Sequence, residues 1–367
     1  MRVRLSASLT AATIAAATAC APAPAELGDV LPRFQETARA LAAGADADGR
    51  TTVSGLDGWL FFGPELRHAS VGPFWGSDAA AVSRARDPEA ADPLAAILDF
   101  RAQLRELGVE LIVMPVPAKS VIYPDQLAAE LSDLSSPPRL DPDHVVFYTL
   151  LRQQGVEVLD LTERFLQVRN HPRGPLYCLR DSHWSGVGCA VASAQLAGAL
   201  LSRSWYGAPP GDAPHIADWR PVTITGDLER EATDGVTGET LQMRSISVAG
   251  GADGASGPRP EPDPNSPVVL LGDSHNLVFH AGDDMHATDG GLPEQLAFEL
   301  GFPVDVVAVR GSASTAARVN LLRRAQADPT YWERKRMVIW VFSVREFTEG
   351  DGWPLIPIRP DPPGDSG

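Results

Sequence analysis

An apolar run that ends in Gly-Asp-Ser is the feature of this 367-residue chain that points most directly to chemistry. Val268 to Leu271 are β-branched residues and leucines, a composition typical of a strand buried on both faces. Gly272 supplies a sharp exit from that strand, which would turn Ser274 outward. A serine hydroxyl is a weak nucleophile at neutral pH and needs a base that a third group orients. Ser274 is therefore a candidate nucleophile that requires a histidine elsewhere in the chain.

The tripeptide Asp-Ser-His occurs twice, at residues 181–183 and at residues 273–275. Only the second copy follows a good buried strand, because Tyr-Cys-Leu-Arg at 177–180 is a poor one. The flanking sequence, and not the tripeptide itself, therefore assigns the nucleophile to the second copy and the acid and base to the first.

Asp181 and His183 are the predicted acid and base. They stand two residues apart, so in extended chain their side chains share a face. The carboxylate can then orient the imidazole, fix its tautomer and stabilise the imidazolium. His275, directly after Ser274, is the rival base. It is disfavoured because its ring would have to fold back onto the neighbouring serine in a strand-to-helix turn.

Five short motifs follow one another along the chain: Gly-Leu-Asp-Gly-Trp-Leu-Phe at 55–61, Pro-Val-Pro-Ala-Lys-Ser-Val-Ile-Tyr-Pro at 115–124, Asp-Ser-His-Trp at 181–184, Gly-Asp-Ser at 272–274 and Trp-Val-Phe-Ser-Val-Arg-Glu-Phe at 340–347. In content and order they resemble the alginate O-acetyltransferase AlgX/AlgJ family, a branch of the SGNH-hydrolase-like proteins. In this branch the Asp-x-His motif precedes Gly-Asp-Ser, the reverse of ordinary SGNH esterases, and this chain has the permuted order.

The resemblance implies an extracytoplasmic enzyme that moves acetyl groups onto an exopolysaccharide through a serine ester. It also implies an acetyl donor supplied by a membrane acyltransferase partner. We predict no cofactor and no metal. The backbone N–H groups of Ser274 and Gly311 are the predicted oxyanion donors, since Gly311 stands where SGNH-like proteins place their second-block glycine. The fourth-block asparagine is missing, and Ser343-Val344-Arg345 occupies that region.

The formal net charge of −16 argues against a nucleic-acid partner, because a polyanion binder needs a basic surface. An anionic glycan would likewise require a locally basic groove. We predict that Arg180, Arg310, Arg345 and Trp184 contact the polysaccharide.

The first residues are predicted to be a targeting segment. Arg2 and Arg4 precede an alanine-rich apolar stretch that is too short to span a bilayer and is typical of a secretory signal. Residues 1–25 therefore indicate export to the periplasm. Cys20 follows Ala-Thr-Ala and is a lipidation candidate that would tether the protein to a membrane, while Ala-Pro-Ala at 23–25 offers an ordinary cleavage site instead.

Cysteine usage agrees with export. Cys178 and Cys189 form an even pair if Cys20 is processed, and they bracket the Asp-x-His motif. We predict a disulfide between them that stiffens the catalytic loop. Two buried thiols are the alternative. A zinc site that adds His183 is a weaker one, because the short paired Cys-x-x-Cys spacing is absent.

Apolar strands alternate with helices through most of the chain. Strands are predicted at 109–114, 156–161, 268–271, 304–309 and 337–342, and helices at 93–107, 145–154, 185–201, 292–300 and 313–324. This alternation predicts an α/β three-layer sandwich with a mainly parallel central sheet of about five strands. Chemistry in such sheets lies outside the carboxyl ends of the strands, where Ser274, Gly311 and Ser343 would emerge.

The remaining segments complete the predicted organisation. An N-terminal helix and linker at 26–54 precede a catalytic domain at 55–350, which includes a Gly/Pro-rich mobile loop at 249–267 and is followed by a Pro-rich tail at 351–367. Three other functions remain open. They are a secreted carbohydrate acetyl esterase, a non-catalytic polysaccharide-binding protein of the export machinery and, remotely, a metal enzyme built on Asp283, Asp284 and His286.

Overall fold

The computed structural model describes residues 24–207, 215–232, 235–250 and 255–359. Most of the predicted signal segment, including the lipidation candidate Cys20, lies outside the described residues, as do residues 360–367 of the predicted tail. Within the described part of the chain, no helix is both long enough and apolar enough to cross a membrane.

A five-stranded parallel sheet forms the centre of the molecule, with strand order β4-β3-β10-β8-β9. The strands are β3 (Glu110–Val116), β4 (Glu157–Val158), β8 (Val268–Gly272), β9 (Asp305–Ala308) and β10 (Met337–Ser343). The predicted α/β architecture is thus confirmed. β4 is shorter than predicted, and a helix begins soon after it at Thr162, whose N–H donates to the Asp160 carboxylate at 3.0 Å.

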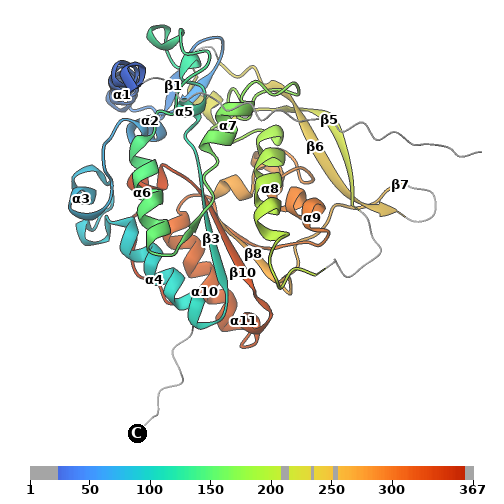
Figure 1. Cartoon of the computed structure of the whole chain (residues 1–367). Helices are drawn as coiled ribbons and strands as arrows, with labels where there is room; N and C mark the ends of the chain where they lie inside the picture. Colours follow the sequence, from blue (N-terminus) through green and yellow to red (C-terminus); the bar gives the residue numbers. More distant parts are fainter. Residues whose placement is uncertain (1–23, 208–214, 233–234, 251–254, 360–367) are drawn as a thin grey trace, which may run out of the picture.

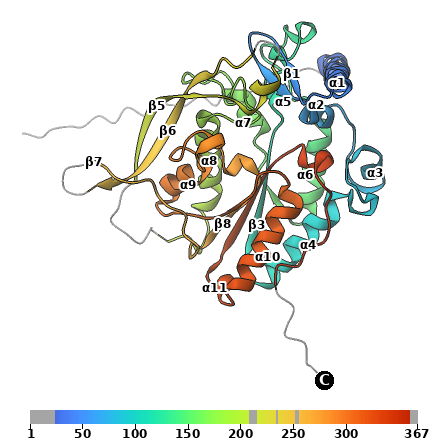
Figure 2. The same cartoon turned by 180° about the vertical axis from the view of Figure 1, so that it is seen from behind.

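Helices cover both faces of this sheet, which makes three layers (Figures 1 and 2). One face carries α4 (Pro93–Glu106), α6 (Pro142–Gln153) and α10 (Arg318–Ala327), and the other carries α8 (Gly186–Leu200) and α9 (Leu292–Leu300). As predicted, Ser185 caps α8, because its Oγ accepts hydrogen bonds from the N–H groups of Val187 and Gly188. Shorter helices connect these elements: α3 (Ala79–Val82), α5 (Lys119–Ile122), α7 (Thr162–Val168), α11 (Tyr331–Arg334) and α12 (Glu346–Glu349).

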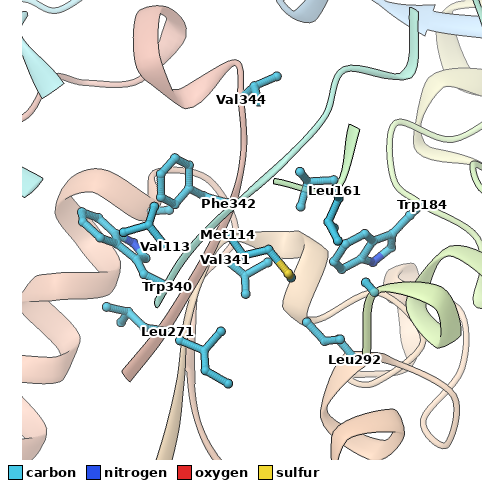
Figure 3. Packing of buried hydrophobic residues seen from close by; sticks show 14 of the residues in the cluster. Val113, Met114, Leu161, Trp184, Leu271, Leu292, Trp340, Val341, Phe342 and Val344 are labelled. Atoms are coloured by element: carbon cyan, nitrogen blue, oxygen red, sulfur yellow. The ribbon is translucent and has the colours of Figure 1, made fainter. Parts of the chain in front are cut away.

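The core lies on both faces of the central strand β10, all of whose residues are buried. Successive side chains alternate between the faces, as strand geometry requires. Trp340 and Phe342 point to the α4 and α10 side, while Val341 shares the opposite side with Trp184 and Leu292 (Figure 3). A strand without charged residues therefore stands at the centre of the sheet.

The N-terminal helix belongs to the same core and is not a separate appendage. α1 (Pro24–Ala47) buries Phe34, Ala38 and Ala42. It leads into β1 (Thr52–Ser54), which pairs antiparallel with β2 (Leu60–Phe62), and α2 (Gly63–Ala69) follows. The described part of the predicted tail is also packed, since Trp353 and Ile358 are buried.

A long antiparallel hairpin, β5 (His215–Ile224) with β6 (Glu239–Gly250), extends beyond α8 and α9 (Figure 1). The described part of residues 249–267, which the sequence predicts to be a mobile loop, makes ordered contacts with the rest of the protein. β7 (Ala255–Ser256) pairs with the end of β6, and the Lys335 ammonium donates to the carbonyls of Pro264 and Ser266 at 2.6 and 3.0 Å. The backbone polar groups of this Gly/Pro-rich segment are thus held by a strand and by a buried lysine.

Candidate active site

Ser274, His183 and Asp181 meet at the carboxyl end of the sheet. The Nε2 atom of His183 lies 2.7 Å from the Ser274 Oγ, and its Nδ1 atom lies 2.7 Å from the Asp181 Oδ1. All three residues are buried, with exposed fractions of 7%, 5% and 1%. This is the geometry of a serine that can pass its proton to a base oriented by a carboxylate.

The end of β8 delivers Ser274 because Gly272 permits a close approach to β10. A Cβ atom on Gly272 would lie 1.7 Å from the Val341 carbonyl oxygen, so no side chain fits there. The Asp273 carboxylate then accepts hydrogen bonds from the N–H groups of His275 (2.9 Å) and Ser343 (2.8 Å). The serine turn is consequently tied to the carboxyl end of the central strand.

The second Asp-Ser-His copy forms an Asp–His pair of its own. The Nδ1 atom of His275 lies 3.1 Å from the Asp273 Oδ1, and its ring centroid is 4.9 Å from that of His183. Burial lowers the pKa of His275 to about 4, although the Asp273 charge opposes that shift. His275 is therefore neutral at physiological pH, and the histidine in hydrogen-bond contact with Ser274 is His183.

The loop that carries Asp181 and His183 is organised by a buried lysine that the sequence reasoning missed. The Lys119 ammonium donates to the carbonyl oxygens of Leu60 (2.6 Å), Leu179 (2.9 Å) and Asp181 (3.1 Å). The Glu239 carboxylate accepts from the N–H groups of Leu179 and Arg180, both at 2.9 Å. The signal that could have indicated Lys119 is that it is the one charged residue of the motif at 115–124.

The Asp181 carboxylate accepts four hydrogen bonds. Its Oδ1 accepts from the N–H and Nδ1 of His183, while its Oδ2 accepts from the Asp227 N–H at 2.9 Å and from the Nε2 of His286 at 3.0 Å. Burial raises the pKa of Asp181, but the His183 charge and these bonds outweigh burial and hold the pKa well below its usual range. The residue is an anion in the folded protein.

Opposing effects also act on His183. Burial lowers the pKa of His183, whereas the charge and hydrogen bond of Asp181 raise it more, so the net pKa lies above its ordinary value. An imidazole of raised basicity next to a serine hydroxyl is suited to receive the serine proton and to hold it during a reaction.

Asp227 and His286 are the contacts of Asp181 that no sequence motif indicated. Asp227 comes close because Gly226 has no side chain: a Cβ atom there would lie 1.9 Å from the Arg180 carbonyl oxygen. One ligand atom each from Asp181, His183 and Asp227 lie within 4.8 Å of one another, a spacing that a metal ion could use. The hydrogen bonds described above already engage the Asp181 and His183 members of that group.

Arg180 and Trp184, two of the predicted substrate contacts, are buried inside the protein. The Arg180 guanidinium is buried and donates to the carbonyls of Gly58 (3.3 Å) and Gly235 (2.8 Å). Trp184 is fully buried in the core, and its indole N–H donates to the His275 carbonyl at 3.0 Å. Both side chains hold the catalytic loop in place from inside the protein.

The other predicted substrate contacts lie at different depths. The Arg345 guanidinium donates to the Ser343 Oγ at 3.0 Å and lies over the Phe62 ring at 5.2 Å. Arg310 is exposed on the surface and pairs with Asp284 at 2.5 Å. Gly311 follows it in an exposed turn with φ of 100°.

Cys178 and Cys189 are both buried free thiols, so the predicted disulfide is not formed. The Cys178 Sγ instead contacts the Trp184 carbonyl oxygen at 3.6 Å, and Cys189 belongs to the first turns of α8. Burial raises the pKa of both thiols, that of Cys178 well above its usual range. The loop is stiffened by Lys119 and Glu239 and does not depend on a covalent bridge.

A parallel α/β sheet that presents a serine after Gly-Asp to an Asp–His pair defines the class of SGNH-hydrolase-like proteins. Residues 52–344 match the sequence model described as SGNH hydrolase-like domain, acetyltransferase AlgX, and the chain belongs to that family. The match begins within β1, close to the domain start at residue 55 that the motifs predicted.

Relatives of known name agree with this family. The chain is 27% identical over 237 residues to a probable alginate O-acetylase AlgJ of Pseudomonas putida, covering 62% of this chain and 55% of that protein. It is 26% identical over 145 residues to a probable alginate O-acetylase AlgJ of Pseudomonas aeruginosa, covering 39% and 32% of the two chains. The chain thus spans about half of the first relative's length and a third of the second's.

Two solved structures share the fold. The O-acetyltransferase domain of Pseudomonas putida AlgJ superposes with a TM-score of 0.57 at 24% identity, covering 81% of this chain and 92% of that one. Pseudomonas aeruginosa AlgX superposes with a TM-score of 0.56 at 16% identity, covering 80% and 62%. At these identities the likeness concerns the fold.

Proposed function

We propose that this protein is a periplasmic O-acetyltransferase that moves acetyl groups onto an exopolysaccharide through an acetyl-Ser274 intermediate. The observation that carries the proposal is the alignment of Ser274, His183 and Asp181, with 2.7 Å at each of the two contacts. Membership of an acetyltransferase family selects acetyl transfer among the reactions that such a serine performs.

In the first half of the cycle, the His183 Nε2 accepts the Ser274 proton while the Oγ attacks the carbonyl carbon of an acetyl donor. The tetrahedral intermediate collapses when the bond to the donor oxygen breaks, and His183 gives its proton to that leaving oxygen. Asp181 stabilises the imidazolium that exists between these two proton transfers. The product of this half-reaction is acetyl-Ser274.

In the second half, a sugar hydroxyl gives its proton to the His183 Nε2 and attacks the acetyl carbon. The bond to the Ser274 Oγ breaks, and the oxygen takes the proton back from His183. Transfer exceeds hydrolysis when the hydroxyl is held in place, because positioning is worth effective concentrations of roughly 10⁵ M or more.

The oxyanion formed in both halves needs N–H donors, and we assign them to Ser274 and Gly311. The assignment is supported by the sheet register, in which Gly272 pairs with Ala308 and the Val309 N–H donates to the Gly272 carbonyl at 3.0 Å. The loop that contains Gly311 therefore leaves the sheet beside the strand that carries the nucleophile.

The acceptor and the cellular setting follow from the relatives and from the sequence. Relatives named alginate O-acetylases support a polysaccharide acceptor, and Arg345 is the cation at the site that would meet an acidic sugar. Arg310 is proposed as a more distant contact. The signal-like residues 1–25 support export, with Cys20 as a lipid tether and a membrane acyltransferase as the acetyl source.

Intact-protein and peptide mass spectrometry test the proposal. After incubation with p-nitrophenyl acetate and rapid acid quenching, the Ser274 peptide should gain one acetyl group, and the Ser274→Ala protein should gain none there. Adding oligosaccharide acceptors should then discharge the enzyme and yield O-acetylated sugar. Release of acetate alone would favour the carbohydrate esterase, and no labelling of Ser274 would favour the non-catalytic polysaccharide-binding protein.

A further inference from the structure

His286 occupies a backbone conformation that an ordinary residue avoids. Its φ and ψ are 74° and −74°, and the Ala287 N–H donates to the Met285 carbonyl at 3.1 Å across it. These angles and this bond define a γ-turn of the positive-φ type, which is rare and strained. The turn ends a 3₁₀ segment, Asp283–Met285, in the loop that follows the serine.

The strained turn drives the imidazole inward although its backbone lies near the surface. The His286 side chain is only 5% exposed, and its Nε2 lies 3.0 Å from the Asp181 Oδ2. The ring also packs against Phe279 at 5.5 Å. Two backbone bonds hold the loop in this shape: Phe279 N–H to the Met285 carbonyl at 2.7 Å, and Gly282 N–H to the Ala287 carbonyl at 3.0 Å.

The turn itself does not require a histidine. Glycine would adopt the same φ without strain, so the loop would close more easily with a smaller residue. Strained residues persist where the surroundings over-determine them, and they cluster at functional sites. Here the strained turn places the His286 side chain in hydrogen-bond contact with the Asp181 carboxylate.

We propose that His286 is a positioning residue of the catalytic unit, which thus extends from His286 through Asp181 and His183 to Ser274. The Nε2–H of His286 donates to the Asp181 Oδ2 and resists rotation of the carboxylate. The Oδ1 then stays aimed at the His183 Nδ1–H, which fixes the tautomer whose Nε2 accepts the serine proton. The acetyl-transfer part of this inference rests on the proposed function.

A matched pair of substitutions separates positioning from structure. His286→Gln keeps an N–H donor near the Nε2 position, whereas His286→Leu has a comparable size and no donor. Both variants bear the same backbone strain, so a difference between them reports the hydrogen bond. We expect the kcat for p-nitrophenyl acetate to fall about 10- to 100-fold in His286→Leu, with KM unchanged, and to fall only a few-fold in His286→Gln.

A second reaction measures the base without any acetyl transfer. Phenylmethylsulfonyl fluoride sulfonylates a nucleophilic serine: an O–S bond forms at Ser274, fluoride leaves and the serine proton passes to His183. The rate should fall in His286→Leu and recover in His286→Gln. Proton NMR should show the downfield His183 Nδ1–H signal in the wild-type protein and in His286→Gln, but broadened or lost in His286→Leu.

The two readouts distinguish failure of this inference from failure of the proposed function. If the wild-type serine is sulfonylated but never transfers acetyl groups, the proposed function fails and the His286 comparison still stands. The positioning role would be overturned if both folded variants kept the sulfonylation rate and the NMR signal of the wild type. Equal losses in both, with no recovery in His286→Gln, would also overturn it and assign His286 a packing role.

Discussion

Asp181→Asn should disable the base while leaving the fold intact, because the change is isosteric but replaces an acceptor with a donor. Each carboxylate oxygen accepts two hydrogen bonds, the Oδ1 from His183 and the Oδ2 from Asp227 and His286. Whichever way the new amide turned, its NH₂ group would face two donors. When it faces His183, the ring must present an unprotonated Nδ1 and carry its proton on Nε2, where it cannot accept the proton of Ser274.

The expected loss is large. A wrong tautomer with no compensating charge costs about 10⁴-fold in kcat when the orienting aspartate of a serine protease is changed in the same way. That factor corresponds to about 5 kcal/mol of transition-state stabilisation. We expect a fall of about 10³- to 10⁴-fold in kcat for acetyl-ester turnover, with little change in KM, because Asp181 is buried and does not touch the substrate.

The dependence of kcat/KM on pH gives an independent test of the role of Asp181. His183 acts as a base only when unprotonated, and Asp181 raises its pKa above the ordinary value of 6.5. The acid limb of kcat/KM in the wild-type protein should therefore have its midpoint above pH 6.5. Removing the Asp181 charge lowers the pKa of His183, so the limb should move to lower pH in Asp181→Asn.

Stopped-flow measurement of p-nitrophenol release across pH provides the assay, with circular dichroism to establish folding. Asp227→Asn is the matched control. It removes a neighbouring charge but keeps the backbone N–H that donates a hydrogen bond to Asp181. The control should lose less than about 10-fold. The reasoning would be refuted if folded Asp181→Asn kept more than about a tenth of the wild-type kcat, or if its acid limb stayed in place.

Ser274→Ala should abolish ester turnover, whereas Ser182→Ala should be mild because that hydroxyl bonds to a surface-facing carboxylate at 2.6 Å; equal losses would reverse the assignment of the two motif copies. Burial lowers the pKa of His275 to about 4, so the unfolded chain takes up its proton first. The contribution of His275 to the free energy of unfolding should be complete above pH 6.5 and fall by about 3 kcal/mol towards pH 4. Urea titrations at several pH values should show that the free energy of unfolding depends less steeply on pH in His275→Asn than in the wild type. An unchanged pH dependence would contradict the lowered pKa. Cys178 and Cys189 should react with maleimide only after unfolding, and a disulfide-linked peptide would contradict the thiol state.

The local signals in the sequence were sufficient to predict the sheet and to place Ser274 at its carboxyl edge. Apolar runs of strand length, separated by helical periodicity, leave few arrangements other than a parallel sheet covered on both faces. A Gly-Asp-Ser that follows such a run places its hydroxyl at the carboxyl edge. These features depend on residues close together in the chain, which is why the alternation of strands and helices was predicted to within a few residues.

Burial and long-range contacts decided what the sequence could not. Arg180 and Trp184 resemble substrate-facing residues in a motif, yet the fold turns both inward, because their hydrogen-bond partners come from segments far away in the chain. The predicted disulfide fails for a related reason, since an even number of cysteines says nothing about where the two thiols point.

The residues that support the loop of Asp181 and His183 were likewise not indicated by the sequence. Lys119 lies 62 residues before the aspartate whose carbonyl it binds, and His286 lies 105 residues after the same aspartate. Neither spacing is a motif, because the sheet and the loops after it set both distances. The sequence by itself determined which strand presents Ser274 and which residue types lie beside it. The tertiary structure alone decided which charged groups surround these residues, because electrostatic interaction depends on distance in space and not along the chain.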